Sequence, residues 1–553
     1  MIDNPDATSK QSGWRFPSTF WYANGAELCE RAAYYGMFIT LIRYLHDMVG
    51  FSDKEAGWVA GLFSSILYLL PTFMGIMADK IGFRRALLVA FTLLTAGYGV
   101  LGAFQLKSTA IASLVLIMFG GAIVKPVISG TAAKCSTDAT RARAMSIFYM
   151  VVNIGAFSGK GLAGDLNDRL GLQYINFYAA GMAFTALVLV ALFYRNVDNK
   201  GTGKTVVEAL RGLLTVMGNF RFLSLILIVA GFWAIQGQLY ASMPTYIERL
   251  MGTGTKPEWL ANINPLVVVL LVVPITHLVR DFKPVNAIGI GLLIIPFTAL
   301  IIALSPALEE ITGRSIDLRI IVLHPITLMI AIGIGLQGLA ECFLSPKFLE
   351  YASKQAPEGE VGLYLGYQHL TTFFAWLFGF VLSGYLLDAY CPDPKHLAPD
   401  ARQQWRMATD PTYRFALPLD EELRNDLDRL GEDTRIATPI IAAFRDHGID
   451  LPEGITVTVG EREGQWMLAD AGAAYTLKRW EVEGDGEPEK LAELLVCVDT
   501  ARSPEAMPPL PEAYNRAHYI WYVFTGVGFT AFLGMLVFKL VTGVIDRRRA
   551  VAR

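Results

Sequence analysis

Charged residues are scarce in this sequence. Asp, Glu, Lys and Arg make up 18% of its 553 residues, whereas hydrophobic residues make up 53%. Soluble domains contain about 25% charged residues, so the composition excludes an ordinary soluble protein and predicts a membrane protein. Charge of one sign is not in excess either, because the net charge is −3. Without a basic surplus, we expect no nucleic-acid partner.

Cysteine is also rare, with five residues, of which Cys391 and Cys497 lie near the two ends of a polar stretch. In an oxidising compartment this pair can form a disulfide that closes the stretch; two unrelated free thiols are the alternative. The sequence lacks phosphate-loop motifs, nucleophile–base arrangements and clusters of metal ligands. We therefore expect neither an enzyme nor a metal or other cofactor.

Long apolar runs dominate the rest of the chain. A helix needs about 20 apolar residues to cross the roughly 30 Å hydrocarbon core of a bilayer, and twelve runs of this kind occur. An N-terminal six-helix bundle, 18–194, is predicted at 18–46, 55–78, 85–105, 109–132, 142–167 and 172–194. A C-terminal set is predicted at 220–249, 259–280, 284–306, 320–350 and 359–388, within 220–388, and at 515–543. The fold class is thus an all-α membrane protein.

Basic residues orient this bundle, because Lys and Arg accumulate on the cytoplasmic side. Basic clusters fall on one side of the twelve-helix count, at 79–85, 140–144, 195–204, 280–283 and 546–549. The tails 1–17 and 544–553 are therefore expected to be cytoplasmic, in a cell membrane such as the bacterial inner membrane. The connector 195–219 contains a predicted amphipathic helix, TVVEALRGLLTVM.

The polar stretch 389–514 interrupts the pattern. Helical periodicity in DEELRNDLDRL and PIIAAFRDHG is followed by strand-like alternation in ITVTVG and AYTLKRWEVEGDGE, which is typical of a small α+β domain. By the helix count it connects the last two spans on the periplasmic or extracellular side. Such an insert can bind a protein partner.

The first apolar run carries charges that a lipid-facing helix would not have, in AELCERAAYYGM at 26–37. Helical spacing places five polar side chains on one face: Glu27, Glu30, Arg31, Tyr34 and Tyr35. A charge at mid-bilayer costs at least about 2.5 kcal/mol, so we expect this face to line a cavity. Two carboxylates beside one arginine predict that one of them binds a proton readily. A structural Arg/Glu knot between helices is the alternative.

Two other runs carry a charge away from their ends. Lys125 precedes Pro126 in the fourth run, and Glu341 precedes Pro346 in the tenth. A cation on one half and an anion on the other suit a zwitterion bound between them. The two could equally form a gate salt bridge when the site is empty.

Together these motifs resemble the proton-dependent oligopeptide transporter (peptide transporter) family of the major facilitator superfamily. ELCERAAYYG is similar to the family's first-helix motif, and GIMADKIGFRR to the superfamily's loop between helices 2 and 3. Further similar segments follow in order along the membrane portion: VKP, FYMVVNIGAFSG, FWAIQGQ, NPLVVVLLVVP and ECFLSP. The insert is not covered. The resemblance implies the major facilitator fold, with twelve helices in two six-helix bundles.

What the resemblance implies is a monomeric symporter that imports di- and tripeptides by alternating access and is driven by the proton gradient. Proton coupling would involve Glu27, Glu30, Arg31 and Lys125. Glu341 would bind the amino terminus of the peptide, with Arg31 and Lys125 on the side of its carboxylate. Further matches to the family's peptide pocket are Tyr34, Tyr35, Tyr68, Asn153, Trp233, Asn264 and Ser345. Single aromatic residues can equally be packing residues.

The loop motif implies a conformational latch, although positive-inside anchoring alone would explain its arginines. The residues concerned are Gly75, Asp79, Gly82, Arg84 and Arg85.

The sequence departs from the family pattern where an arginine on helix 1 and an acidic residue on helix 7 pair across the cavity. Phe38 and Gly237 stand at these positions. Losing both partners avoids an unpaired buried charge but leaves the gate undefined. Two functional alternatives follow: transport of another small solute, such as an anion, a modified amino acid or a peptide-like drug, or a membrane-anchored receptor that acts through the insert.

Overall fold

The structure of the protein, a computed structural model, describes most of the chain. The described residues are 16–137, 140–195, 206–252, 255–319, 321–355, 367–410, 414–418, 458–462, 465–469, 475–479, 493–498 and 509–551.

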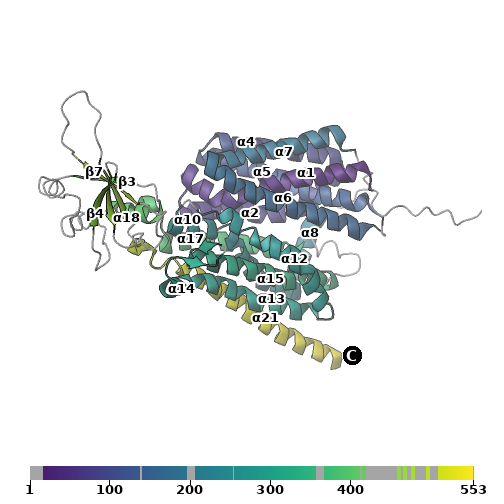
Figure 1. Ribbon diagram of the computed structural model, residues 1–553. Helices are drawn as coiled ribbons and strands as arrows, with labels where there is room; N and C mark the ends of the chain where they lie inside the picture. Colours follow the sequence, from purple (N-terminus) through teal and green to yellow (C-terminus); the bar gives the residue numbers. More distant parts are fainter. Residues whose placement is uncertain are drawn as a thin grey trace, which may run out of the picture.

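The N-terminal half forms a bundle of long helices (Figure 1). Its first helix, α1 (Ser18–Arg43), continues into a π-helical turn, η1 (Tyr44–Met48). The second predicted helix is divided at Pro71 into α2 (Asp53–Leu69) and α3 (Pro71–Ile81), because proline lacks a backbone N–H and is best placed in the first turn of a helix. The bundle is completed by α4 (Phe83–Ala103), α5 (Lys107–Lys134), α6 (Arg141–Leu170) and α7 (Leu172–Phe193).

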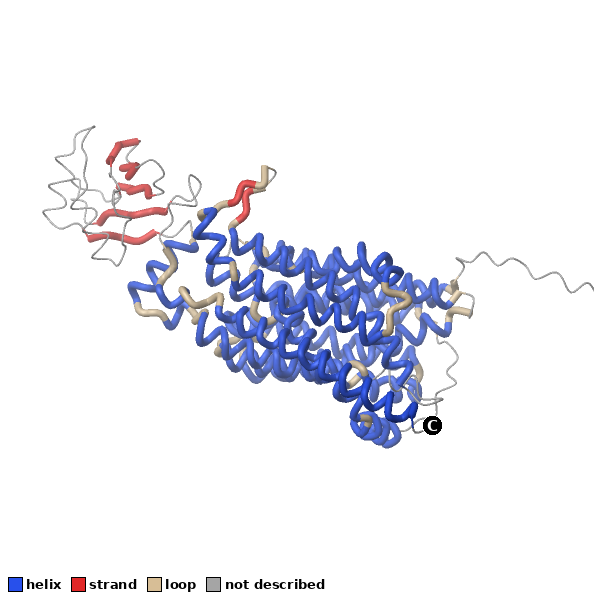
Figure 2. Tube along the Cα trace, turned by 90° about the horizontal axis from the view of Figure 1, so that it is seen from below, coloured by secondary structure: helices blue, strands red, loops and turns tan. Residues whose placement is uncertain are grey.

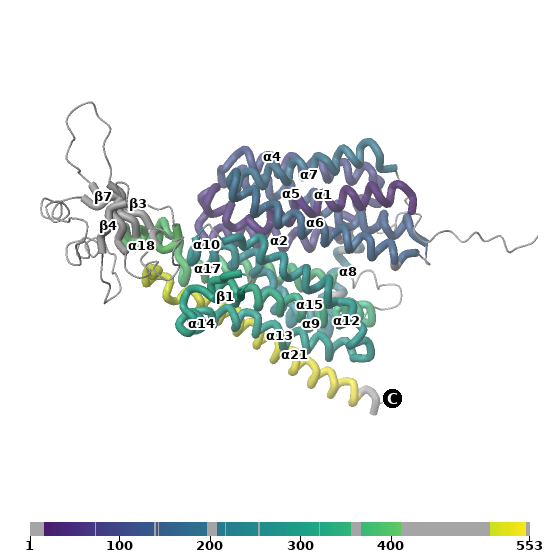
Figure 3. Tube along the Cα trace, viewed as in Figure 1, coloured from purple at the N-terminus to yellow at the C-terminus, as the bar shows by residue number. Residues whose placement is uncertain are grey.

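The C-terminal helices form a second bundle beside the first (Figure 3). The predicted connector helix is confirmed as α8 (Val206–Gly218). It is followed by α9 (Phe220–Gln236), η2 (Gly237–Leu239), α10 (Met243–Met251), α11 (Pro257–Leu260) and α12 (Ile263–Leu278). The remaining elements are α13 (Pro284–Ala303), α14 (Ser305–Thr312), the strand pair β1 (Ile316–Asp317) and β2 (Val322–Leu323), α15 (Pro325–Gln355), α17 (Leu370–Tyr390) and α21 (Tyr519–Val551).

Close packing of glycines joins α2 of the first bundle to α17 of the second. A Cβ added to Gly57 would lie 2.7 Å from the Phe380 carbonyl oxygen, and one added to Gly384 would lie 2.4 Å from the Asp53 carbonyl oxygen. Lipid tails contact apolar side chains as favourably as another helix does, so membrane helices associate through close packing at small residues such as these. The bundles also touch where α1 meets α10 and where α6 meets α11.

The described parts of the stretch 389–514 contain a helix and a sheet, which lie at one end of the helical body (Figure 2). A short turn, η3 (Pro394–His396), precedes the helix α18 (Pro399–Thr409). The sheet is antiparallel with the order β3-β7-β6-β5-β4. Its strands are β3 (Arg414–Pro418), β4 (Thr458–Arg462), β5 (Gln465–Ala469), β6 (Tyr475–Arg479) and β7 (Glu493–Val498). The helices predicted at DEELRNDLDRL and PIIAAFRDHG lie outside the described residues.

The predicted disulfide is not formed, because Cys391 is a free thiol. Cys391 follows the last turn of α17 and is fully buried among the helix ends, where its carbonyl oxygen accepts a hydrogen bond from Arg249 Nη1 at 2.6 Å. Cys497 lies in β7, opposite Arg414 of β3. The two cysteines therefore belong to different parts of the structure, the helix ends and the sheet.

Among the described residues, nine helices are long and apolar enough to cross a membrane, or ten if the bent pair α2 and α3 counts as one span. This is fewer than the twelve expected. The long helices α1 and α6 are not among these apolar helices, and both contain charged residues within their length.

The contact between α2 and α17 leads to a first prediction. Gly384→Ala should lower the apparent melting temperature of detergent-purified protein, since an added Cβ would clash with backbone and overpacking costs about 1–3 kcal/mol. The matched control is Gly526→Ala in α21, where no heavy atom lies within 4 Å of the added Cβ. Equal melting temperatures for the two variants would contradict this packing.

Candidate functional site

The charged face of α1 is buried inside the N-terminal bundle. Glu27 and Glu30 are each 1% exposed, and Arg31 lies between them. The Arg31 Nε is 3.2 Å from Glu27 Oε1, an i,i+4 pair, and the guanidinium also pairs with Glu30. One arginine thus serves two carboxylates. The second oxygen of Glu27 has no hydrogen-bond partner among the described residues, which leaves it available to a proton.

Lys125 joins this group from α5. A small cavity is lined by Glu30, Arg31, Tyr68 and Lys125, among others, and the Lys125 Nζ lies 4.7 Å from the centre of the Tyr68 ring. Lys125 interacts electrostatically with both carboxylates and with Arg31. The structure therefore brings together the four residues that sequence analysis assigned to proton coupling, two carboxyl groups and two basic side chains.

Glu341 occupies the opposite bundle, in α15. Its neighbours are polar side chains from α9 and α12, Gln236 and Asn264. Three buried atoms there have no hydrogen-bond partner among the described residues: Glu341 Oε2, Asn264 Nδ2 and Ser345 Oγ. Buried polar atoms are normally paired, so this group of donors and acceptors is suited to a polar ligand.

The other predicted pocket residues differ in their surroundings. Tyr34 is buried and stacks on Phe38 with ring centres 5.1 Å apart, whereas Tyr35 lies beside Tyr240 at 6.4 Å. Asn153 donates its amide N–H to the Tyr149 carbonyl oxygen of its own helix. Trp233 is partly buried against the core, in edge contact with Phe232.

Sequence analysis missed Lys160 of α6, a cation that is buried in the structure. It is 1% exposed, and its Nζ donates to the Ala261 carbonyl oxygen at 3.1 Å. Glu341 is the carboxylate with which it interacts electrostatically. Among the ion pairs of the described residues, none joins Lys125 to Glu341. The sequence did contain a signal for Lys160, because a charged residue within the predicted span 142–167 is unusual.

The loop motif lies between α3 and α4. Gly82 has a φ of +91° at the turn, a left-handed conformation that favours glycine, and Gly75 packs on Pro126. Arg84 donates to the Ala191 carbonyl oxygen of α7 at 2.7 Å, while Arg85 is exposed. Arg84 thus anchors the turn to its own bundle, and a latch role for this motif, including Asp79, stays a prediction.

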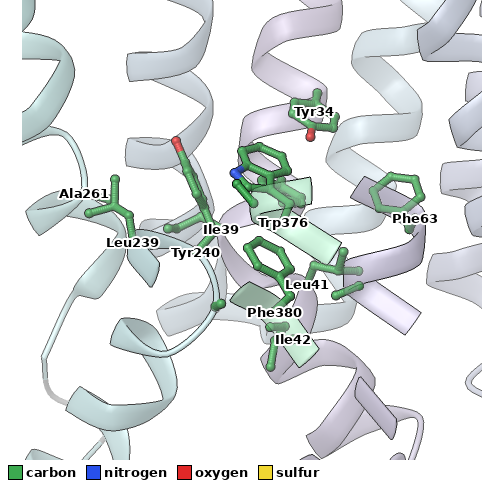
Figure 4. Close-up of a cluster of buried hydrophobic side chains, with 14 of the residues drawn as sticks. Tyr34, Ile39, Leu41, Ile42, Phe63, Leu239, Tyr240, Ala261, Trp376 and Phe380 are labelled. Atoms are coloured by element: carbon green, nitrogen blue, oxygen red, sulfur yellow. The ribbon is translucent and has the colours of Figure 1, made fainter. Parts of the chain in front are cut away.

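An aromatic cluster occupies the place of the absent charge pair. The Phe38 ring lies 5.2 Å from Trp376 and 5.0 Å from Tyr240, and Figure 4 shows Tyr240, Trp376 and Phe380 grouped at this point. A Cβ on Gly237 would lie 3.2 Å from both Trp376 and Phe380. The small residue therefore makes room for the large rings, and apolar contact replaces an ion pair between the bundles.

Beyond this cluster, toward the insert, ion pairs connect the two bundles. Arg43 donates to Glu248 at 2.9 Å and to Glu258 at 3.2 Å. Arg249 binds both oxygens of Asp53, at 2.8 and 2.9 Å. Three of these residues, Arg43, Glu248 and Arg249, line a cavity of about 510 Å³ between η1, α10 and α18. Because Arg43 and Asp53 belong to the first bundle and their partners to the second, this end of the protein is closed.

His46 of η1 adds a titratable contact to this closure. Its ring lies 3.2 Å from Asp393, 2.7 Å from Asp47 and 3.8 Å from Asp53. Burial lowers the pKa of His46, but hydrogen bonds to Asp393 and Asp47 and the charge of Asp53 outweigh it and raise the pKa to about 9, although Arg249 opposes them. His46 is therefore a charged member of the contact between η1 and the insert.

The sequence model of a protein family, the Major Facilitator Superfamily, matches residues 28–315 of this chain. The chain is 24% identical to "Multidrug resistance protein MdtH" of Aeromonas salmonicida, over 61% of this chain and 81% of that protein. It is 22% identical to "Dipeptide and tripeptide permease A" of Citrobacter koseri, over 69% of this chain and 87% of that protein.

Among solved structures, the fold is similar to that of a POT family transporter in complex with 5-aminolevulinic acid. The TM-score is 0.58 at 19% sequence identity, and the match covers 67% of this chain and 91% of the other.

The contacts of His46 predict a pH dependence. Its pKa in the folded protein, about 9, is above the ordinary value of 6.5, so its stabilisation is complete below pH 6.5 and is lost as the pH rises through about 9. The difference in melting temperature between the wild type and His46→Gln should therefore shrink from pH 6 toward high pH. A difference that stays constant from pH 6 to high pH would contradict the assignment.

Proposed function

Because the chain belongs to the Major Facilitator Superfamily, whose model matches just over half of it, we propose that it is a proton-coupled symporter importing di- and tripeptides. Its helices adopt the major facilitator fold. In the proposed topology, twelve helices cross the membrane, both termini are cytoplasmic, and the insert faces the periplasm or the extracellular space. The protein works as a monomer.

One observation supports this proposal above the others. Opposite charges that face the interior are divided between the bundles: Arg31 and Lys125 with two carboxylates in the first, and Glu341 in the second. A peptide is a zwitterion, so its carboxylate and ammonium match the two sides. Superfamily transporters place their substrate between the two halves near the midplane.

Proton coupling follows from the shared arginine. Protonation of Glu27 or Glu30 removes one negative charge and frees Arg31 and Lys125 to bind the peptide carboxylate. Glu341 holds the ammonium. The bundles then rock about the aromatic cluster. The ion pairs near the insert form and close that end of the protein, while the cavity opens at the opposite end. Release of the peptide lets the helix 1 carboxylate lose its proton.

A second candidate function is transport of another small solute. The absence of the charge pair at Phe38 and Gly237 favours it, because the aromatic cluster there leaves fewer charged groups to bind a peptide. Competition of labelled substrate uptake by mixed dipeptides separates the two candidates. A receptor role for the insert stays a prediction, and transport after deletion of 391–513 would count against it.

Proteoliposome uptake tests the proton assignment. Glu30→Gln should abolish uptake of a labelled dipeptide driven by an inward proton gradient while sparing counterflow exchange, because the carboxylate that carries the proton is gone. The matched control is Glu55→Gln, an exposed carboxylate at the start of α2. Unaltered gradient-driven uptake in Glu30→Gln would contradict the proposed coupling.

Binding tests the assignment of Glu341. Glu341→Gln should weaken dipeptide binding by roughly 10- to 150-fold, since a hydrogen bond to a charged group contributes about 1.5–3 kcal/mol. The control ligand is the same dipeptide with its amino group acetylated, whose binding should not change between the wild type and the variant. Failure of every dipeptide to bind folded wild-type protein would favour the second candidate function.

A further inference from the structure

Lys160 is a buried cation that the mechanism above does not use. It lies on α6, where Gly159 packs against α1 and Gly161 against Trp259, so that α6 is wedged between its own bundle and the other one. Its Nζ donates to Ala261, at the junction of α11 and α12, and lies 5.9 Å from the centre of the Tyr35 ring. Lys160 therefore reaches across the interface beside a residue of the predicted pocket.

Among the described residues, the hydrogen-bond partner of this ammonium is a neutral carbonyl group, which is unusual for a buried charge. A buried charge is normally paired with an opposite charge, because desolvation is expensive. The carboxylate that interacts with Lys160 is Glu341, whose Oε2 has no hydrogen-bond partner among the described residues. A cation from the first bundle and an anion from the second thus face the same region, each incompletely satisfied.

Charge balance shows what this arrangement requires. Two carboxylates, Arg31 and Lys125 balance on the α1 side, and one added proton compensates the carboxylate of a bound peptide. On the other side, Glu341 balances Lys160. A peptide ammonium that binds Glu341 neutralises this carboxylate and leaves the buried Lys160 without a compensating charge nearby. A second carboxylate on the substrate would restore the balance.

We propose that Lys160 is a specificity-determining residue that binds a carboxylate on the first residue of the substrate, so that the site prefers peptides beginning with Asp or Glu. This inference rests on the proposed function. The carboxylate must belong to the first residue because its amino group is held by Glu341, beside Lys160. The hydrogen bond to Ala261 crosses between the bundles, so their separation at that end frees the ammonium to meet the incoming substrate.

Competition experiments with the full-length protein in proteoliposomes test this selectivity. Uptake of labelled Ala-Ala is competed by Asp-Ala and its isostere Asn-Ala, and by the reversed pair Ala-Asp and Ala-Asn. In the wild type, Asp-Ala should compete roughly tenfold better than Asn-Ala, the size expected of one charge-assisted contact, whereas the reversed pair should differ little. Lys160→Met should abolish the preference for Asp-Ala, and Lys160→Arg should retain it.

Controls separate specificity from folding. Lys107→Met removes an exposed lysine that pairs with Glu55 in the same bundle and should leave the ratio unchanged. If Lys160→Met does not yield monodisperse protein, Lys160→Gln replaces it, and thermal shifts with Asp-Ala and Asn-Ala measure binding without a proton gradient. A purely structural role would lower stability in the lysine variants without changing the ratio between the two dipeptides.

The outcomes distinguish this inference from the proposed function. The role of Lys160 is overturned if Asp-Ala and Asn-Ala compete equally in the wild type, or if the preference for Asp-Ala survives in Lys160→Met. Peptide transport is still supported in that case, provided that Ala-Ala is taken up. Absence of Ala-Ala uptake by folded wild-type protein overturns the proposed function, and this inference with it.

Discussion

A charge within the thickness of a bilayer must be compensated, and the arrangement of the helices follows from this constraint. The cost of an unpaired charge in lipid is several kcal/mol, so charged side chains are kept at the interfaces inside and between the bundles. Arg31 meets its carboxylates within one turn of α1. Arg43 and Arg249 reach acidic residues of the opposite bundle instead. Charge compensation thus accounts both for the charged site on α1 and for the ion pairs that close the end of the protein near the insert.

Close approach of backbones makes these pairs possible. Gly155 and Gly159 let α6 lie directly on α1, and Gly57 and Gly384 do the same for α2 and α17. With the helices this near, short contacts such as that between Asp53 and Arg249 form across the bundles. The aromatic cluster around Phe38 shows that a charge pair is not the sole solution: a large residue on one bundle and a glycine on the other give a packed contact that needs no compensation.

The chain that follows α17 returns to the helix ends before it enters the sheet. Trp405 of α18 donates to the Arg249 carbonyl oxygen at 2.8 Å, and Asp393 meets His46 of the other bundle. The insert is thereby attached to both bundles at their closed end. A movement that separates the bundles there must break these contacts, so the insert is mechanically connected to the closure between the bundles.

Much of the fold and part of the site could be predicted from the sequence alone. Apolar runs located the long helices, and spacing placed Glu27, Glu30 and Arg31 on one face, because neighbours within a helix are set by its period. Motif order also indicated that Lys125 belongs with them. Pro71, where the second predicted helix breaks, and Lys160 are also present in the sequence, but the sequence does not say which residues they contact.

Only the tertiary structure decided which side chains meet across helices. The pairing of Lys160 with Ala261 and its proximity to Glu341, the ion pairs of Arg43, and the free thiol of Cys391 depend on the depth and rotation of separate helices. Sequence spacing does not contain these quantities, because they are set by packing against residues far away in the chain. The sequence by itself determined which charges must be compensated, and the tertiary structure determined the partners.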